Sequence, residues 1–317
     1  MLAITYAYLG AESDAAKFAK KGTASDITLF DTKKGETHLN IVHPTRFPEK
    51  IQSLLYSLDL ADEVILHPSA IDRPFGETVI GAELFGKTRG FVRLGGTLVA
   101  EQVRDLLSKT PLRELTISEE PEGVFRETLY ERAGTSAVGP TLVPVDHSFA
   151  VKGVGTVILG LVRSGQVTTH QTLQAYPGDK KIEVRSIQVH DVDHKSAPTR
   201  CRVGLAVKGA EASEVSRGTV LAPPGSLQVI PAKSPRVVPV SIHRFSKWSP
   251  KAGATLHIFH SMQDVVARLE EEPGADHGEI ELRLALDTPL AVVPGQPAVL
   301  VDLDNKAQRF VGAAALK

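Results

Sequence analysis

Apolar residues follow two different spacing patterns in the first 140 positions of the chain. Between Pro48 and Leu58 they recur three or four positions apart, which predicts a helix with one apolar face. The same spacing predicts helices over residues 77–84 and 98–107. Short continuous apolar runs predict strands over residues 2–9, 39–42, 63–66, 90–94 and 112–117. Strands that alternate with helices are typical of an α/β domain with a mainly parallel sheet.

The rhythm changes at the small-residue stretch 134–140, which reads as a linker. Beyond it, β-branched runs are separated by glycine turns such as Lys152-Gly153 and Lys208-Gly209, a texture typical of an antiparallel barrel. Prolines between residues 223 and 235 mark a second boundary, and the rest of the chain keeps the all-β texture. The pattern predicts an α/β domain plus two all-β domains, over residues 1–139, 140–229 and 230–317.

Composition narrows the class of protein. Of the 317 residues, 42% are hydrophobic and 23% are charged, which is ordinary for a soluble globular protein. The chain has no apolar run long enough to span a membrane, and its first residues lack the basic region of a secretion signal. The single cysteine, Cys201, excludes an intrachain disulfide and a cysteine metal cluster. We therefore expect a cytoplasmic protein without a membrane partner.

Charge is unevenly distributed although the formal net charge is only -1. Residues 141–229 carry three more Lys and Arg than Asp and Glu, whereas the residues before them carry an acidic excess. The middle domain is therefore the part best suited to face a polyanion. An ordinary solvated surface is the alternative interpretation of so small an excess.

The middle domain carries a series of short motifs in a fixed order. It opens with Asp146-His147-Ser148-Phe149 and then Lys152-Gly153-Val154-Gly155-Thr156-Val157. Three further runs follow, over residues 184–190, 202–205 and 215–221. In this order and spacing they resemble the second domain of the EF-Tu/SelB family of translation elongation factors, closest to archaeal SelB-like paralogues. The resemblance implies a GTPase-like α/β domain followed by two EF-Tu-type β-barrels.

The GTP-binding motifs that this resemblance implies are missing. A phosphate-binding loop needs Gly-x-x-x-x-Gly-Lys-Ser/Thr after the first strand, whereas residues 10–17 read GAESDAAK. Glu12 and Asp14 place negative charge where phosphate would lie. The magnesium-binding Asp-x-x-Gly is replaced by VHPTR at residues 42–46.

The two motifs that read the guanine base are absent as well. Residues 93–96 read RLGG in place of Asn-Lys-x-Asp, and residues 117–120 read ISEE in place of the last base contact. Asp26-Ile27-Thr28 weakly resembles the segment that carries the switch threonine of GTPases. The preferred interpretation of Thr28 is an ordinary strand hydroxyl. We therefore expect a degenerate GTPase-like domain with no GTPase activity and no bound cofactor.

The sequence gives only weak signals for a metal site or a catalytic site. His190, Asp191, Asp193 and His194 are dense enough to suggest N/O ligands, but a polar loop is the preferred interpretation. His257 and His260 lie three apart in a strand-like run, which places them on opposite faces. No catalytic residue and no metal site are predicted.

The resemblance also implies a ligand site in the middle domain. Asp146, His147 and Arg202 match the positions with which SelB holds the amino-acid end of a charged tRNA. Arg202 supplies a fixed donor fork for an anion, and His147 a titratable donor. Ribose and phosphate at the acceptor end could contact three further cations, Lys152, Arg185 and Arg217. The alternative, that these residues are inherited remnants without a ligand, stays open.

A second basic–aromatic group, Arg244, Lys247 and Trp248, could stack on RNA, although a tryptophan in this setting is more often a packing residue. The leading hypothesis is thus a translation-factor paralogue, monomeric off the ribosome, that binds tRNA or the ribosome independently of nucleotide. The alternatives are a GTP-binding elongation factor that delivers a specialised aminoacyl-tRNA, and a protein-interaction scaffold in translation.

Overall fold

The computed structural model describes the chain from residue 1 to 316, apart from residues 136–137, 250 and 274–277. Part of the linker expected at residues 134–140 lies outside the described residues. The chain forms two compact units. Unit 1 contains residues 1–139, 161–167 and 187–203, and unit 2 contains residues 140–160, 168–186 and 204–317. The domain limits predicted at residues 139 and 229 stay predictions.

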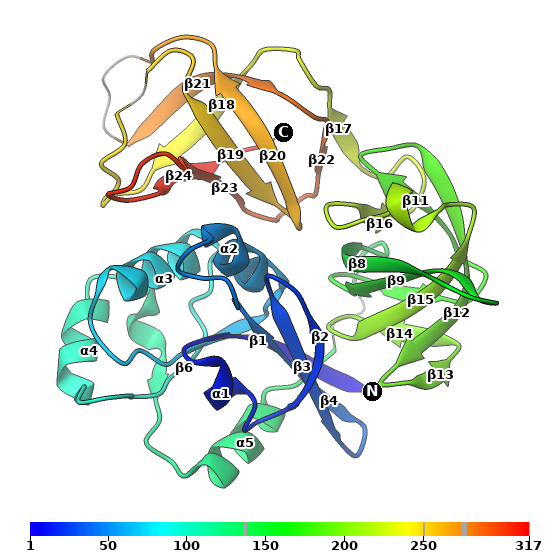
Figure 1. The fold of residues 1–317 in the computed structure, drawn as a ribbon, viewed down its shortest axis with the longest axis horizontal. Coiled ribbons are helices and arrows are strands. Elements are labelled where there is room, and N and C mark those ends of the chain that lie inside the picture. Colours follow the sequence, from blue (N-terminus) through cyan, green and yellow to red (C-terminus); the bar gives the residue numbers. More distant parts are fainter. Residues whose placement is uncertain (136–137, 250, 274–277, 317) are drawn as a thin grey trace. The chain divides into compact units, whose positions relative to one another are not determined.

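Unit 1 is built on a seven-stranded sheet with the strand order β2-β3-β4-β1-β5-β6-β7 (Figure 1). Its strands are β1 (Leu2–Leu9), β2 (Lys20–Ala24), β3 (Thr28–Lys34), β4 (Thr37–His43), β5 (Glu63–Leu66), β6 (Gly90–Val92) and β7 (Thr116–Ile117). Its helices are α1 (Glu12–Ala15), α2 (Ile51–Leu60), α3 (Arg73–Leu84), α4 (Ala100–Leu107) and α5 (Glu122–Glu131). β1 pairs in parallel with β4 and β5, and β6 pairs in parallel with β5 and β7. The α/β class with a mainly parallel sheet is confirmed.

Two features of this domain differ from the sequence prediction. Residues 112–115 were expected to begin a strand, but Pro111–Glu114 form a 3-10 turn and only Thr116–Ile117 are extended. The turn begins there because Pro111 favours its first position and the Thr110 side chain accepts a hydrogen bond from the Leu112 amide. The β2–β3 hairpin and helices α1 and α5 were not predicted.

Aromatic side chains fill one face of the central sheet. Tyr6 and Tyr8 of β1 point to this face together with Phe91 of β6, and all three are buried. Helix α5 covers them with Phe125, whose ring lies 5.1 Å from that of Phe91 in an edge-to-face contact. The Tyr6 hydroxyl donates a hydrogen bond of 3.2 Å to the carbonyl oxygen of Leu129. This bond fixes α5 to the first strand.

Removing that hydroxyl is expected to weaken the packing of α5. The substitution Tyr6→Phe keeps the ring but leaves the buried Leu129 carbonyl without its donor, which should lower the free energy of unfolding by about 1 kcal/mol. Urea unfolding followed by circular dichroism measures the change. Tyr130→Phe is the control, because its hydroxyl is only partly buried and its bond to Thr32 is long, at 3.4 Å. Equal losses in the two variants would contradict the proposed role of Tyr6.

The middle barrel is an antiparallel sheet with the order β11-β16-β8-β9-β15-β12-β13, closed by an additional pairing of β11 with β12. The strands of this sheet are β8 (Val143–Val151), β9 (Gly155–Leu161), β11 (Thr172–Tyr176), β12 (Lys180–Val189), β13 (Val192–His194), β15 (Arg202–Lys208) and β16 (Val220–Ala222). Strands β10 (Gln166–Thr168) and β14 (Ser196–Pro198) form a separate two-stranded sheet. Gly153 and Gly155 adopt φ values of 81° and 97° in the turn between β8 and β9. Only glycine adopts such values freely, so these two residues permit the tight hairpin expected there.

The last part of unit 2 is a closed barrel with the order β18-β21-β20-β19-β23-β24 (Figure 1). Its strands, together with the separate β17–β22 pair, are β17 (Gln228–Ile230), β18 (Arg236–Ile242), β19 (Thr255–His260), β20 (Gln263–Leu269), β21 (Glu279–Leu286), β22 (Leu290–Val292), β23 (Ala298–Val301) and β24 (Phe310–Ala314). Tyr176, Val220 and Ala291 belong to one buried cluster that joins the two barrels in unit 2. Among the described residues, none of the helices combines the length and the apolar character that a membrane crossing needs.

Candidate functional site

Asp146 and His147 lie at an irregular point of the β8–β9 hairpin. Val145 is opposite Gly160 and His147 is opposite Leu159, so Asp146 is an extra residue in β8. Such a bulge bends the strand and re-aims its side chains. Gly160 is required here, because a Cβ at this position would lie only 2.6 Å from the Pro144 carbonyl oxygen. The bulge therefore places a buried Asp146 carboxylate next to the half-buried His147 ring, with 3.6 Å between Oδ1 and Nδ1.

Arg217 approaches the same bulge from the turn before β16. Its Nε donates a hydrogen bond of 3.1 Å to the backbone carbonyl of Asp146. Gly218, the next residue, has a φ of 93°, which lets the turn reverse at this point. The structure thus brings three of the predicted site residues, Asp146, His147 and Arg217, to one place in unit 2.

Lys152 and Arg185 lie at the turn between β8 and β9. Both side chains are exposed, and Nη1 of Arg185, from β12, donates to the carbonyl of Val154 at 3.4 Å. Phe149 and Val154 are also exposed, at 44% and 40%. We call Phe149, Lys152, Val154 and Arg185 the hairpin surface. It combines two cations with an exposed aromatic ring, the chemistry that binds phosphates and stacks on unpaired bases.

Arg202 begins β15 and belongs to unit 1, whereas Asp146 and His147 belong to unit 2. Its Nη2 lies 3.4 Å from the Thr23 hydroxyl oxygen of β2. Its charge also helps to hold the pKa of Asp31 below the ordinary value, after the larger effect of a hydrogen bond from His190. The grouping of Arg202 with Asp146 and His147 around one ligand stays a prediction.

His190 is engaged within unit 1. Its Nδ1 lies 2.7 Å from Oδ2 of Asp31, and its ring packs against that of His38 in a tilted contact with 4.6 Å between centroids. Burial lowers the pKa of His38 to about 4, so this ring is neutral at pH 7. Within the described residues no group of three or more His, Cys, Asp or Glu side chains could hold a metal ion.

The second basic–aromatic group lies in the turn after β18. Trp248 is half-buried and packs against the core of the last barrel, while Lys247 is exposed. The exposed ring of this turn belongs to Phe245, which is 52% exposed and has the Arg244 guanidinium 4.9 Å from its centroid. An RNA base could therefore reach Phe245 more easily than the Trp248 named from the sequence.

The carboxyl ends of β1, β4 and β5 meet at the edge where open α/β sheets commonly bind ligands. His67, directly after β5, is close to the backbone of the loop that follows β1. A Cβ on Gly10 would lie 2.7 Å from the Cβ of His67. The Tyr8 hydroxyl is 2.5 Å from Nδ1 of His67, and Nε2 of His43 lies 2.9 Å from the Gly10 carbonyl oxygen. Two histidines, with pKa values lowered by burial, therefore pack on this loop.

Two lysines close to the loop after β1, Lys17 and Lys21, are paired with carboxylates. Lys17 lies 3.0 Å from the Asp14 carboxylate and 2.7 Å from that of Glu122. Lys21 lies 2.6 Å from the Glu12 carboxylate. The helix that follows the loop, α1, is a single turn of four residues. The charges of these two lysines are thus balanced within the chain, and the helix after the loop is short.

The loops after β5 and β6 contact each other at the same edge. The Gly95 amide donates to the Pro68 carbonyl at 3.1 Å. A Cβ on Gly96 would lie 2.6 Å from the Ser69 carbonyl oxygen. Arg93 donates to the Glu120 carbonyl at 2.6 Å, and its guanidinium lies 4.6 Å from the centroid of the Phe125 ring. The loops after β5 and β6 are therefore held together by close backbone contacts, and Arg93 is engaged with the segment before α5.

Comparison with known proteins places the chain in a family. It is 33% identical to "Uncharacterized protein MJ0325" of Methanocaldococcus jannaschii over 301 residues, 95% of this chain and 94% of that protein. It is 38% identical to the selenocysteine-specific elongation factor of the same organism over 79 residues, 25% of this chain and 17% of that factor. The elongation factor 1-alpha of Metallosphaera sedula is 23% identical over 321 aligned positions, with 81% and 70% of the two chains covered.

The fold agrees with these relatives. A crystal structure of a bacterial selenocysteine-specific elongation factor, EF-Sec, superimposes with a TM-score of 0.81 and 21% identity over 100% of this chain and 58% of that one. The chain belongs to the SelB- and EF-1α-like translation factors. A search against protein-family models found no match.

The SelB-like architecture expected from the motifs is thereby confirmed: an α/β domain followed by β-barrels. Two site features of this SelB-like chain were not predicted from the sequence. Phe149 was part of a motif, and its exposure became visible only in the hairpin. His67 had one weak signal, a histidine directly after a fully buried strand. Its packing on Gly10 follows from a contact across 57 positions that no local pattern reveals.

Proposed function

We propose that this SelB-like translation factor binds RNA, either tRNA or the ribosome, through its middle barrel without a nucleotide switch. It would act as a monomer in the cytoplasm, and RNA binding would persist until another molecule or a change of ionic conditions displaces it. GTP hydrolysis would have no part in release, so the protein would not be an enzyme.

The packing of His67 on Gly10 is the observation that carries the nucleotide-independent part of the proposal. A phosphate-binding loop needs free backbone N–H groups and room for a phosphate close to its glycines. In this chain the first loop glycine has His67 within contact distance, and carboxylates pair with the loop lysines. A triphosphate would have to displace His67, whose Cβ and carbonyl oxygen approach Gly10, and would meet the charge of Glu12 and Asp14. Both effects oppose GTP binding.

The hairpin surface supports the RNA-binding part of the proposal. Lys152 and Arg185 are exposed, and within the described part of the chain neither forms an ion pair with a carboxylate, in contrast to Lys17 and Lys21. Phosphate contacts from such cations supply most of the sequence-independent affinity of RNA-binding proteins. The selenocysteine-specific elongation factors that this chain resembles are translation factors by name, which supports the same class of partner.

Binding measured across a salt series tests the proposal. The full chain is titrated with fluorescently labelled total tRNA and, separately, with purified ribosomes, at 50 to 300 mM KCl with and without GTP and Mg²⁺. We expect an affinity that falls steeply as salt rises, because each phosphate contact releases bound counterions. GTP should leave both the affinity and the thermal unfolding midpoint unchanged.

Each other outcome selects a different function. Binding that appears only with GTP, together with a raised unfolding midpoint, would overturn the proposal in favour of a GTP-binding elongation factor. Failure to bind either tRNA or ribosomes at low salt would also overturn it and would leave the protein-interaction scaffold. Ribosome binding without tRNA binding would retain the proposal and identify which RNA is the partner.

A further inference from the structure

Asp62 is a half-buried carboxylate between α2 and β5, at the end of β5 opposite to His67. Its Oδ2 accepts a hydrogen bond of 3.0 Å from the Thr5 amide of β1, and its own amide donates to the Thr5 carbonyl at 2.7 Å. The side chain is therefore held at a fixed position beside the central strand. Its second oxygen, Oδ1, is left to face other partners.

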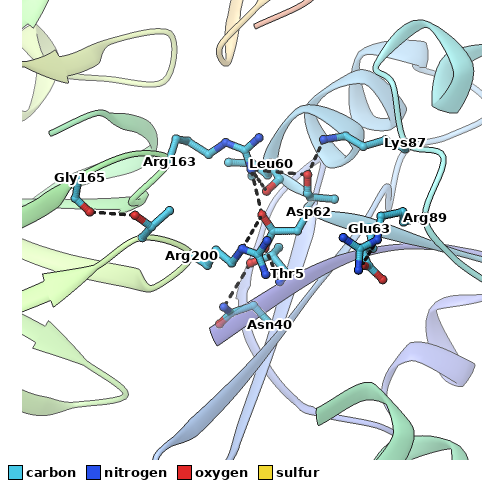
Figure 2. Close-up of polar contacts among 12 residues, drawn as sticks. Thr5, Asn40, Leu60, Asp62, Glu63, Lys87, Arg89, Arg163, Gly165 and Arg200 are labelled. Carbon is cyan, nitrogen blue, oxygen red and sulfur yellow. Dashed lines mark hydrogen bonds and ion pairs between the residues drawn. The ribbon is translucent and has the colours of Figure 1, made fainter. Parts of the chain in front are cut away.

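Two arginines from distant segments converge on Oδ1 of Asp62, as Figure 2 shows. Nη1 of Arg163 lies 3.6 Å from it and Nε of Arg200 lies 3.7 Å from it. Arg163 also donates to the Leu60 carbonyl at 3.2 Å, at the end of α2. Both arginines belong by sequence to the middle barrel, but segments 161–167 and 187–203 are compact with the α/β domain in unit 1. We call Asp62, Arg163 and Arg200 the latch.

The two latch segments are also bonded to each other. The Arg200 amide donates to the Val162 carbonyl at 2.7 Å, and the Val162 amide donates to the Cys201 carbonyl at 3.0 Å. The Thr199 hydroxyl donates to the Gly165 carbonyl at 2.8 Å. Arg200 has a φ of 72°, a left-handed conformation that costs energy in a residue with a side chain. The surrounding bonds therefore fix the backbone from which the guanidinium reaches Asp62.

A separate contact holds the second segment at another strand. His190 pairs with Asp31 of β3. Arg202 lies against Thr23 of β2. The segment 187–203 thus contacts the α/β domain both beside β5 and at the β2–β3 hairpin. Contacts at two separated places resist rotation as well as separation.

We propose that the latch joins segments 161–167 and 187–203 permanently to the α/β domain, so that no bound nucleotide sets their position. In GTPases, switch segments are ordered by contacts with the γ-phosphate and are released on hydrolysis. Here the contacts are made by side chains of the chain itself, at the opposite end of β5. Only one part of this inference rests on the proposed function, namely that no bound nucleotide sets the position of the two segments. The latch itself is independent of RNA binding.

Hydrogen–deuterium exchange of the full chain, followed by mass spectrometry, tests the latch. The variants are Asp62→Asn, which keeps the size of the side chain but removes its charge, and Arg163→Met. In both we expect peptides that contain the Val162 and Arg200 amides to exchange about 10-fold faster, because each variant breaks a partly buried ion pair and Arg163→Met also removes the hydrogen bond to the Leu60 carbonyl. Asp105→Asn, an exposed carboxylate on α4, is the matched control and should leave exchange unchanged.

Two results would overturn the proposal. The first is unchanged exchange in these peptides when both Asp62→Asn and Arg163→Met fold normally. The second is a change in their exchange in the unmodified protein when GTP and Mg²⁺ are added. Two independent variants keep the test informative if one of them fails to fold. Loss of tRNA and ribosome binding would contradict the proposed function but leave the latch standing, so the two failures are distinguishable.

Discussion

Replacing Lys152 and Arg185 together by glutamate is expected to weaken tRNA binding by about 100-fold at 0.1 M salt, because two phosphate contacts become two repulsions. The slope of log affinity against log salt should become shallower by roughly 0.7 for each of the two lost phosphate contacts, the value for a single strand. Both side chains are exposed on the hairpin surface, so the fold should be preserved. Fluorescence anisotropy with labelled tRNA across a salt series measures both quantities.

Two control variants distinguish RNA binding by the hairpin surface from attraction of RNA by the net charge of the protein. Lys306→Glu changes an exposed lysine of the last barrel and should alter affinity by less than about threefold, as expected for a charge remote from the bound strand. Phe149→Ala should weaken binding by about 10-fold without changing the salt slope, because base stacking contributes energy without releasing counterions. If Lys306→Glu were as damaging as the double variant, RNA would be bound by net charge and not by the hairpin surface.

The parallel sheet could be predicted because its central strands are buried on both faces. β1 and β5 are continuous apolar runs for this reason, and their predicted limits agree with the structure. Helix α2 was predicted from four apolar residues at helical spacing, although it begins three residues later than expected. The β2–β3 hairpin was missed because β2 is an edge strand with mostly exposed polar residues, which gives no alternating pattern.

Helix α5 shows why a weak pattern can still form a buried element. Phe125 and Leu129 are its fully buried residues, four positions apart, and most of the others are exposed. Two apolar residues are too few for a periodic signal. The helix is held instead by contacts that no local sequence pattern predicts, such as the edge-to-face packing of Phe125 on Phe91.

The candidate sites were predictable only where a motif carried them. The motif around Asp146 and His147 named both residues, but the bulge that places them depends on the register between β8 and β9. The latch has no motif at all. Asp62 and Arg163 are separated by 101 positions and Arg200 by a further 37, and each alone reads as an ordinary surface charge. Only the fold brings them together.

Lys87 is expected to make the protein more stable as the pH rises above 7. Its side chain is buried, with Nζ donating to the Ala61 carbonyl, and burial lowers its pKa to about 7. The charge of Arg163 lowers the pKa further, while Asp59 and Asp62 oppose the shift. In the unfolded chain the pKa returns to about 10.4. The unfolded state therefore binds more protons between about pH 7 and 10, and stability increases with pH in that window.

The expected gain is about 1.5 kcal/mol between pH 7 and 8.5, since each pH unit inside the window adds at most about 1.4 kcal/mol. Urea unfolding at the two pH values measures it in the unmodified protein and in Lys87→Met, which keeps the length of the side chain but cannot be protonated. The difference between the two proteins isolates Lys87 from other groups, and Lys251→Met, an exposed lysine, should behave like the unmodified protein.

The same variant links the buried lysine to the latch. A protonated Lys87 repels Arg163, which shares the Asp62 carboxylate with Arg200, so the latch carries an excess of positive charge below pH 7. Lys87→Met should therefore slow exchange of the Val162 and Arg200 amides at pH 6, once the ordinary pH effect on exchange is removed, and have little effect at pH 8.5. A stability gain that persists in Lys87→Met would show that another group titrates in this window. Exchange that is unaffected at both pH values would show that the charge of Lys87 does not reach the latch.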